Sequence, residues 1–188
     1  MMRRISVVGN SGSGKSRLAA ELALILNSEH TELDAIIHQS NWVDLELDEF
    51  RRRVNERLEA SSWVIDGNYA QVRDLVWRRA DTVVWIDPSR RTVMTRLLRR
   101  TLARLITGRE LWNGNRETWR DLLSFDPNRS VVMWAWVEHR RYQAAYQAAS
   151  RDPIWASLRF VRVHGTRDRV WLLSEARAAV RGGGADRR

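Results

Sequence analysis

The stretch RISVVGNSGSGKSRLAAELALIL, residues 4–26, decides the fold of this chain. It opens with RISVVG (residues 4–9), a run rich in β-branched residues that is typical of a strand. It closes with KSRLAAELALIL (residues 15–26), whose composition and apolar spacing favour a helix. Between them GNSGSGKS fits the pattern G-x-x-x-x-G-K-S/T. The order of strand, glycine-rich loop and helix is the context that this motif requires.

The motif predicts a loop that binds phosphate groups. Glycines let the backbone turn tightly and bring its N–H groups close to phosphate oxygens. The helix that follows offers its N-terminal amides and dipole to an anion. We expect Lys15 to reach the β- and γ-phosphates of a nucleotide and the Ser16 hydroxyl to hold Mg²⁺. The predicted cradle consists of Gly9, Asn10, Ser11, Gly12, Ser13, Gly14, Lys15 and Ser16.

Lys15 is the single lysine among the 32 Lys and Arg residues of the chain. Base composition can account for a general bias toward arginine. Nearly every position that tolerates a generic cation is Arg, but position 15 is Lys. A flexible ammonium placed against phosphates is not replaced by a planar guanidinium, which is consistent with a specific task for Lys15.

Length and composition indicate one globular domain. A chain of 188 residues can bury a full core, and 44% hydrophobic with 29% charged residues is typical of a soluble protein. With no cysteine, disulfides and cysteine-ligated zinc are excluded. No apolar run approaches the roughly 20 residues of a membrane span. We therefore expect a cytoplasmic protein that does not enter a membrane.

Charge is distributed unevenly along the chain, whose net charge is +9. Residues 88–120 hold nine Arg against two Glu, whereas residues 29–50 hold seven acidic residues and neither Lys nor Arg. A basic block indicates nucleic acid, a polyphosphate substrate or a solvated helix. We do not favour nucleic acid, because the sequence lacks a known nucleic-acid-binding motif.

Apolar runs of strand type alternate with helical segments. We predict strands near 4–9, 30–34, 62–66, 82–87 and 159–164, and helices near 15–27, 48–60, 70–79, 89–106, 129–149 and 167–181. This alternation predicts an α/β fold, a three-layer α/β/α sandwich around a five-stranded, mainly parallel sheet. Ligands in such sheets bind beyond the carboxyl ends of the strands.

The predicted strand ends are rich in functional groups. Strands two, three and four end at Asp34, Asp66 and Asp87, and the fifth strand ends at His164, Gly165 and Thr166. A single Asp after a strand is most often a turn former or a helix cap. Three carboxylates on the rim of one phosphate site point instead to a shared crevice.

The bounds of the lid and of the domain are predicted from the points at which the alternation of strands and helices is interrupted. The segment 107–128 is the least regular, and we expect a helical lid inserted at about 100–128. We expect a single domain over residues 1–181 and a flexible tail over residues 182–188.

Several motifs together resemble a known family. They are GNSGSGKS, ELDAI followed by Trp42, WVIDGNY, VRDLVWRRADTVVWIDPS, RLLRR and LWNGNRE. They resemble the P-loop kinases of the adenylate kinase and shikimate/gluconate kinase type over nearly the whole chain. The nearest likeness is to bacterial adenylate kinase-like "topology modulation" proteins of undefined substrate. The resemblance implies an ATP-dependent kinase that uses Mg²⁺.

The resemblance also implies residue roles on the nucleotide side. Asp66 would be the carboxylate near Mg²⁺, on a strand beside the first one. Arg96 and Arg100 match family arginines that stack on the base and clamp phosphates, and they are four residues apart on one helix face. Gly165 and Thr166 would approach the adenine base through their backbone.

On the acceptor side, the resemblance implies that Asp34 binds or helps to deprotonate a substrate hydroxyl; a helix-capping role is the alternative. Trp42 is the best candidate to line the acceptor site. The family signature continues with Pro and Arg where this chain has Asn68 and Tyr69, which weakens the prediction of a nucleoside monophosphate acceptor. Asp87 resembles a structural turn residue.

The sequence thus predicts a Mg-ATP phosphotransferase that acts on a small acceptor, either a nucleoside monophosphate or a hydroxylated metabolite. Lys15, Asp34, Asp66, Arg96 and Arg100 are the candidate catalytic residues, with Ser16 and Asp66 as candidate metal ligands. An ATP-binding or ATP-hydrolysing regulator and a nucleic-acid-associated protein remain as alternatives. Either a monomer or a homodimer fits the sequence.

Overall fold

A computed structural model gives the structure of residues 2–127 and 130–185. Its centre is a five-stranded sheet with the order β2-β3-β1-β4-β5, in which every neighbouring pair is parallel. The strands are β1 (Arg4–Gly9), β2 (Glu29–Glu32), β3 (Trp63–Asp66), β4 (Thr82–Ile86) and β5 (Arg159–Val163). The predicted parallel sheet is confirmed, and so is the expected place of β3 beside β1.

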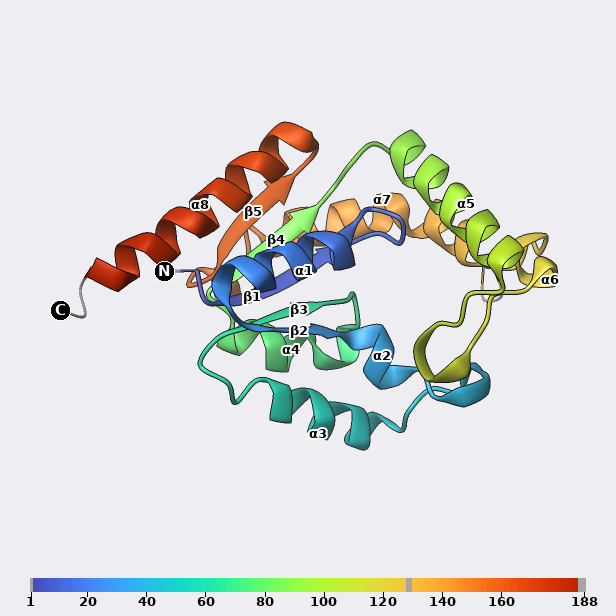
Figure 1. Cartoon of the computed structure of the whole chain (residues 1–188), viewed down its shortest axis with the longest axis horizontal. Coiled ribbons are helices and arrows are strands. Elements are labelled where there is room, and N and C mark those ends of the chain that lie inside the picture. The colour runs from blue at the N-terminus through green and yellow to red at the C-terminus, as the bar shows by residue number, and fades with distance from the viewer. Residues whose placement is uncertain (1, 128–129, 186–188) are drawn as a thin grey trace.

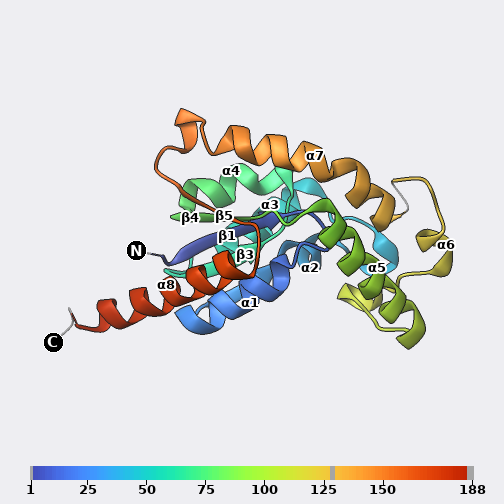
Figure 2. The same cartoon turned by 90° about the horizontal axis from the view of Figure 1, so that it is seen from above.

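Helices cover both faces of this sheet, as Figure 2 shows with α1 and α8 below it and α4 and α7 above it. The helices are α1 (Lys15–Leu26), α2 (Leu33–Ile37), α3 (Leu47–Arg57), α4 (Ala70–Arg79), α5 (Arg90–Thr107), α6 (Trp119–Leu122), α7 (Val131–Ala149) and α8 (Thr166–Ala185). Short 3₁₀ turns are η1 (Ser40–Trp42), η2 (Trp112–Gly114) and η3 (Pro153–Trp155). The three-layer α/β/α architecture is therefore confirmed.

Alternation along the buried strands builds two cores. On β1, Ile5 and Val7 join the cluster formed with α1 and α8, whereas Val8 joins the cluster formed with α3, α4 and α7. On β4 the same alternation sends Val84 to the first cluster and Trp85 to the second. A strand buried on both faces is apolar at nearly every position, which explains why these strands read as almost continuous apolar runs.

The second strand ends earlier than predicted. We expected it to run over 30–34 and to end at Asp34, but β2 ends at Glu32 and Asp34 lies in α2. The ladder to β3 stops at the pair Glu32 and Asp66, where β3 itself ends. Beyond that pair the chain has no strand partner, and it turns into a short helix.

The connection between α5 and α7 lies at the end of the sheet opposite to both termini (Figure 1). It contains η2 and α6, and it occupies the region where we expected a lid at 100–128. Helix α8 continues through 182–185, part of the predicted tail, while 186–188 lie outside the described residues. In the part of the chain that the structure describes, no helix is both long enough and apolar enough to cross a membrane.

Candidate phosphate-binding and acceptor site

The loop between β1 and α1 is packed too closely for side chains at two of its glycines. Gly9 has φ +144°, and a Cβ there would lie 2.4 Å from the Ile86 carbonyl oxygen. Gly12 has φ +78°, and a Cβ there would lie 2.9 Å from both Leu97 Cβ and the Val93 carbonyl oxygen. Only glycine combines this backbone conformation with such close approach to β4 and α5. The motif glycines therefore have a steric reason to be there.

The same loop presents unused donors at the start of α1. In the described residues the backbone N–H groups of Gly14, Lys15 and Ser16 have no hydrogen-bond partner. First-turn amides of a helix with a positive dipole end suit an anion. These groups therefore fit the phosphate chain of a nucleotide.

Lys15 is the first residue of α1, and its side chain contacts the phosphate loop that precedes it. Its ammonium donates to the Asn10 carbonyl oxygen at 3.3 Å. Burial lowers the pKa of Lys15, whereas the carboxylates of Asp34 and Asp66 oppose that shift. A buried ammonium near carboxylates, free to move on a flexible stem, suits the task predicted for Lys15.

Asp66 connects the loop to the second strand of the sheet. Its side chain is only 3% exposed. Oδ1 accepts a hydrogen bond from Ser16 Oγ at 3.2 Å, and Oδ2 lies 2.7 Å from His30 Nε2. A hydroxyl and a buried carboxylate form an oxygen donor pair of the kind that Mg²⁺ prefers. The two residues predicted to hold Mg²⁺ thus lie together, and they fit that ion.

The two predicted arginines extend from α5 to the loop. Arg96 Nη1 donates to the Ser13 carbonyl oxygen at 3.2 Å, and Arg100 Nη2 donates to Ser11 Oγ at 3.3 Å. Burial lowers the pKa of Arg100 to about 10, with the charge of Arg104 acting in the same direction. Arg100 Nε and Ser13 Oγ are buried without a partner in the described residues. These two groups are hydrogen-bond donors at the phosphate loop, so they are suited to binding an anion.

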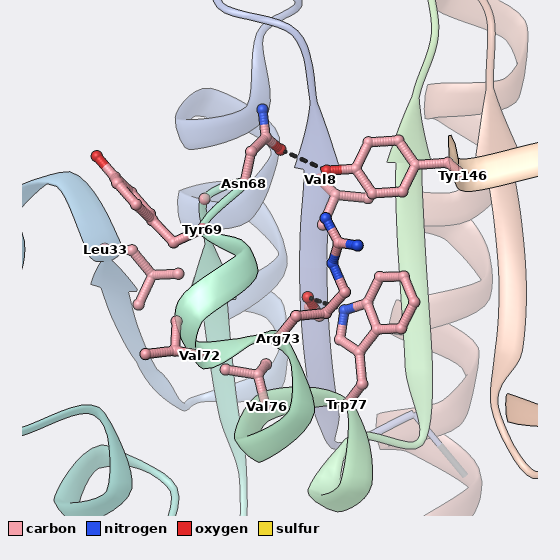
Figure 3. A pocket seen from close by; sticks show the side chains of 11 residues that line it. Val8, Leu33, Asn68, Tyr69, Val72, Arg73, Val76, Trp77 and Tyr146 are labelled. Carbon is pink, nitrogen blue, oxygen red and sulfur yellow. Dashed lines mark hydrogen bonds between the residues drawn. The ribbon is translucent and has the colours of Figure 1, made fainter. Parts of the chain in front are cut away.

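Asn68 anchors the loop to the helix layer, a role that sequence analysis missed. Its Oδ1 accepts from the Gly9 amide at 3.0 Å and from the Tyr146 hydroxyl at 2.9 Å, and its Nδ2 donates to the Gly9 carbonyl at 2.6 Å. The bond to Tyr146 is drawn in Figure 3. The sequence offered one signal, because Asn68 interrupts the family signature.

Asn10 makes a second connection to α7. Its Nδ2 donates to the Ala135 carbonyl at 2.8 Å and lies 3.4 Å from His139 Nδ1. Burial lowers the pKa of His139. The loop is therefore held from one side by the helix that follows the lid segment.

The cavity in Figure 3 is too small for a substrate. Its volume is about 10 Å³, roughly the space of one water molecule. Arg73 lines this cavity. Its guanidinium lies 5.3 Å from the centre of the Trp77 ring and 5.8 Å from the centre of the Tyr146 ring. Arg73 thus supports the contact between α4 and α7.

Asp34 occupies the far side of the loop from α5. Its Oδ1 accepts from the Tyr69 hydroxyl at 2.7 Å, and that hydroxyl also lies 3.2 Å from His38 Nε2. His38 Nδ1 in turn lies 2.9 Å from Asp44 Oδ1. Burial and the nearby Asp34 charge raise the pKa of Tyr69, which keeps its hydroxyl protonated as a donor. A polar chain therefore orients Asp34, and Tyr69 and His38 are residues of this site that sequence analysis did not find.

The connection between α5 and α7, where we predicted a lid, contacts this side of the site. Asn115 Oδ1 accepts from the Trp42 amide at 2.9 Å, and its Nδ2 donates to the Gln39 carbonyl at 2.8 Å. Trp112 Nε1 donates to Glu32 Oε2 at 3.1 Å. Trp42, the predicted wall of the acceptor site, is 41% exposed and takes φ +57°, which is rare for a bulky residue. Such backbone conformations concentrate at functional sites.

The remaining predicted residues lie at the other strand ends. Gly165 and Thr166 stand where β5 passes into α8, and no hydrogen bond within the described residues joins them to the loop. Asp87 is buried and accepts from Gln143 Nε2 at 2.9 Å and from Arg162 Nε at 3.0 Å. These contacts agree with a structural role for Asp87.

A parallel sheet with β1 between β3 and β4, and a phosphate-type loop that leads into α1, defines the P-loop kinase fold. The sequence matches no protein-family model and no curated protein. Several solved structures match the fold. A shikimate kinase from Acinetobacter baumannii in complex with shikimate has a TM-score of 0.54 and 16% identity, over 97% of this chain and 95% of that one.

Two further solved structures are also kinases. A deoxyadenosine kinase from M. mycoides with bound dCTP has a TM-score of 0.50 and 15% identity, over 91% of this chain and 96% of that one. A gluconokinase from Sinorhizobium meliloti 1021 has a TM-score of 0.49 and 18% identity, over 96% and 97%. The shikimate kinase and deoxyadenosine kinase matches, together with the parallel sheet, show the fold of the P-loop kinases, as the motifs predicted. The narrower likeness to the "topology modulation" group stays a prediction.

Proposed function

We propose that this protein is a Mg-ATP-dependent phosphotransferase that moves the γ-phosphoryl group of ATP to a hydroxyl of a small acceptor. One observation carries the proposal. Several donors meet at the phosphate loop: the unpaired amides at the start of α1, the Lys15 ammonium and, reaching over from α5, the Arg100 guanidinium. They lie beside the Ser16 and Asp66 pair. Phosphoryl transfer depends mainly on positioning and on charge neutralisation, which these groups supply.

The proposed roles follow from charge and contact. The loop amides and Lys15 bind the phosphate chain, while Arg96 and Arg100 neutralise the migrating group from the side of α5. Ser16 and Asp66 would hold Mg²⁺, which would supply further neutralisation of phosphate charge. Gly165 and Thr166 remain the residues that we propose to lie against the base.

Asp34 is the proposed general base. In the transfer step the acceptor oxygen bonds to the γ-phosphorus, the bond from that phosphorus to the β,γ-bridging oxygen breaks, and the acceptor proton passes to an Asp34 oxygen. The products are ADP and the phosphorylated acceptor. Tyr69 donates to Asp34 Oδ1, which leaves Oδ2 for the acceptor hydroxyl.

The surroundings of Asp34 favour a hydroxylated acceptor over a nucleoside monophosphate. Glu32, Asp34 and Asp44 place negative charge on this side of the site, where an acceptor phosphate would be repelled. Arg73, which could have gripped a phosphate, lies instead on Trp77.

The test is transfer of labelled γ-phosphoryl from Mg-ATP to a panel of polyols, hydroxy acids, nucleoside monophosphates and oligonucleotides. A labelled product whose formation is lost in Lys15→Ala supports the proposal. Arg100→Ala should lower the transfer rate strongly, whereas Arg99→Ala, at an exposed position on the same helix, is the matched control.

Other outcomes separate the alternatives. Lys15-dependent hydrolysis that no member of the panel stimulates would overturn the transferase reading in favour of an ATP-hydrolysing regulator. Labelling of oligonucleotides alone would favour the nucleic-acid-associated class. Failure to bind ATP would overturn the proposal altogether.

A further inference from the structure

Three potential metal ligands meet on one face of the sheet, beside the phosphate loop. His30 and Glu32 are two residues apart on β2, so their side chains lie on the same face. Glu32 on β2 is the register partner of Asp66 on β3. All three side chains therefore lie on one face of the sheet. One imidazole nitrogen and two carboxylate oxygens, one from each residue, all lie within 4.8 Å of one another.

The three side chains are accessible to a small ion but shielded from bulk solvent. Asp66 is buried, whereas His30 and Glu32 are half-buried. Asp66 Oδ2 and His30 Nε2 share a hydrogen bond of 2.7 Å, and a bound ion would take the place of the shared proton. Glu32 Oε2 is held by the Trp112 indole at 3.1 Å, which leaves Oε1 available. The donors are therefore positioned by their own neighbours before any ion binds.

Electrostatics at this point favours a cation. Glu32 and Asp66 bring two carboxylates together in partly desolvated surroundings, and like charges so placed repel. Lys15 supplies one positive charge nearby. Its ammonium is turned to the loop carbonyl of Asn10. A divalent ion between the carboxylates would relieve the repulsion directly.

We propose that His30, Glu32 and Asp66 bind a divalent first-row transition-metal ion through one nitrogen and two oxygens. The imidazole sets the class of ion, because Mg²⁺ and Ca²⁺ prefer oxygen ligands whereas Mn²⁺, Fe²⁺ and Zn²⁺ accept mixed nitrogen and oxygen sets. This site differs from the Ser16 and Asp66 pair in its ligands. Asp66 turns Oδ1 to Ser16 and Oδ2 to His30, so a single carboxylate lies between the two sites.

The inference does not rest on the proposed kinase activity, and its test uses no nucleotide. Mn²⁺ is titrated into chelator-treated full-length protein, and bound Mn²⁺ is followed by electron paramagnetic resonance. We expect one bound Mn²⁺ with a nitrogen modulation from a directly coordinated imidazole. Mg²⁺ should compete poorly with it.

Variants assign the ligands. Loss of an outer-shell partner already weakens metal binding about 10–100-fold, so His30→Gln should weaken Mn²⁺ binding at least tenfold and abolish the nitrogen modulation. Glu32→Gln should weaken binding and keep the modulation. His164→Gln is the matched control, because that exposed histidine follows β5, lies beside Asp87 and is not part of the cluster. Ser16→Ala should keep the nitrogen modulation, because the Ser16 hydroxyl only donates to Asp66 Oδ1 and is not itself a ligand of this site.

Three results would overturn the proposal: no Mn²⁺ bound in the absence of nucleotide, a bound ion without nitrogen modulation, or equal affinity of His30→Gln and the unmodified protein. Circular dichroism and metal-free thermal unfolding establish that each variant is folded. Since ATP binding is measured separately on the same preparation, failure of the metal site and failure of the proposed kinase function are distinguishable.

Discussion

Removal of the Asn68 side chain should loosen the phosphate loop. Asn68→Ala deletes three hydrogen bonds at once: two to the backbone of Gly9 and one from the Tyr146 hydroxyl. These bonds join the end of β1 to the loop that follows β3 and to α7. In their absence Gly9 keeps its pairing with Ile86 of β4 and loses its connection to the loop after β3.

The magnitude follows from the number of bonds. An intramolecular hydrogen bond contributes about 1 kcal/mol net to stability, and a buried partner left unsatisfied costs about 1–3 kcal/mol. Asn68→Ala should therefore lower the free energy of unfolding by about 3 kcal/mol. Tyr146→Phe removes only one of the three bonds, so about 1 kcal/mol is expected for it.

Urea unfolding of the two single variants and the double variant provides the assay. Because the double variant also removes the hydroxyl that Asn68→Ala leaves without a partner, its loss should be smaller than the sum of the single losses by about 1 kcal/mol. ATP affinity should fall in Asn68→Ala in parallel with stability. Strictly additive losses, or a loss below about 0.5 kcal/mol in Asn68→Ala, would refute the reasoning.

The other predictions concern the acceptor side and the lid. Asp34→Asn should lower the transfer rate about 10²–10⁴-fold with ATP affinity unchanged in equilibrium titrations; loss of ATP binding would contradict a base role. Burial and the charge of Asp66 raise the pKa of Glu32, so its ionisation lowers stability as the pH rises from the unfolded-state pKa to the higher folded-state pKa, and the full cost is present above that. Glu32→Gln should therefore be more stable than the unmodified protein in metal-free urea unfolding at pH 8, with the gain disappearing near pH 4; an equal gain at both pH values would contradict this. Asn115→Ala removes the bonds to Trp42 and Gln39, and amide exchange over residues 108–118 should accelerate while the sheet is unaffected.

Local signals in the sequence determined much of the fold. The observed β1 (Arg4–Gly9) and α4 (Ala70–Arg79) have the predicted bounds, because an apolar β-branched run and a helix between turn residues are each encoded within a few residues. The phosphate loop was equally readable, since its glycines and Lys15 are contiguous. Arg96 and Arg100 were predicted from the resemblance of RLLRR to the family motif, and their spacing of four residues places them on one helix face.

The sequence did not predict the features that depend on pairing between distant segments. The sequence placed the end of the second strand at Asp34, but the ladder between Glu32 and Asp66 ends it two residues earlier. The same register brings His30 to Asp66, although 36 residues separate them along the chain.

The sequence by itself therefore determined the layers of the fold, the phosphate loop and the residues most directly tied to it. Only the tertiary structure decided which groups support them: Asn68 on the loop, Tyr69 on Asp34, and His30 beside Asp66. The physical reason is that periodicity and turn chemistry act over a few neighbouring residues. A side-chain cluster, in contrast, is fixed by strand register and helix packing, which no single segment contains.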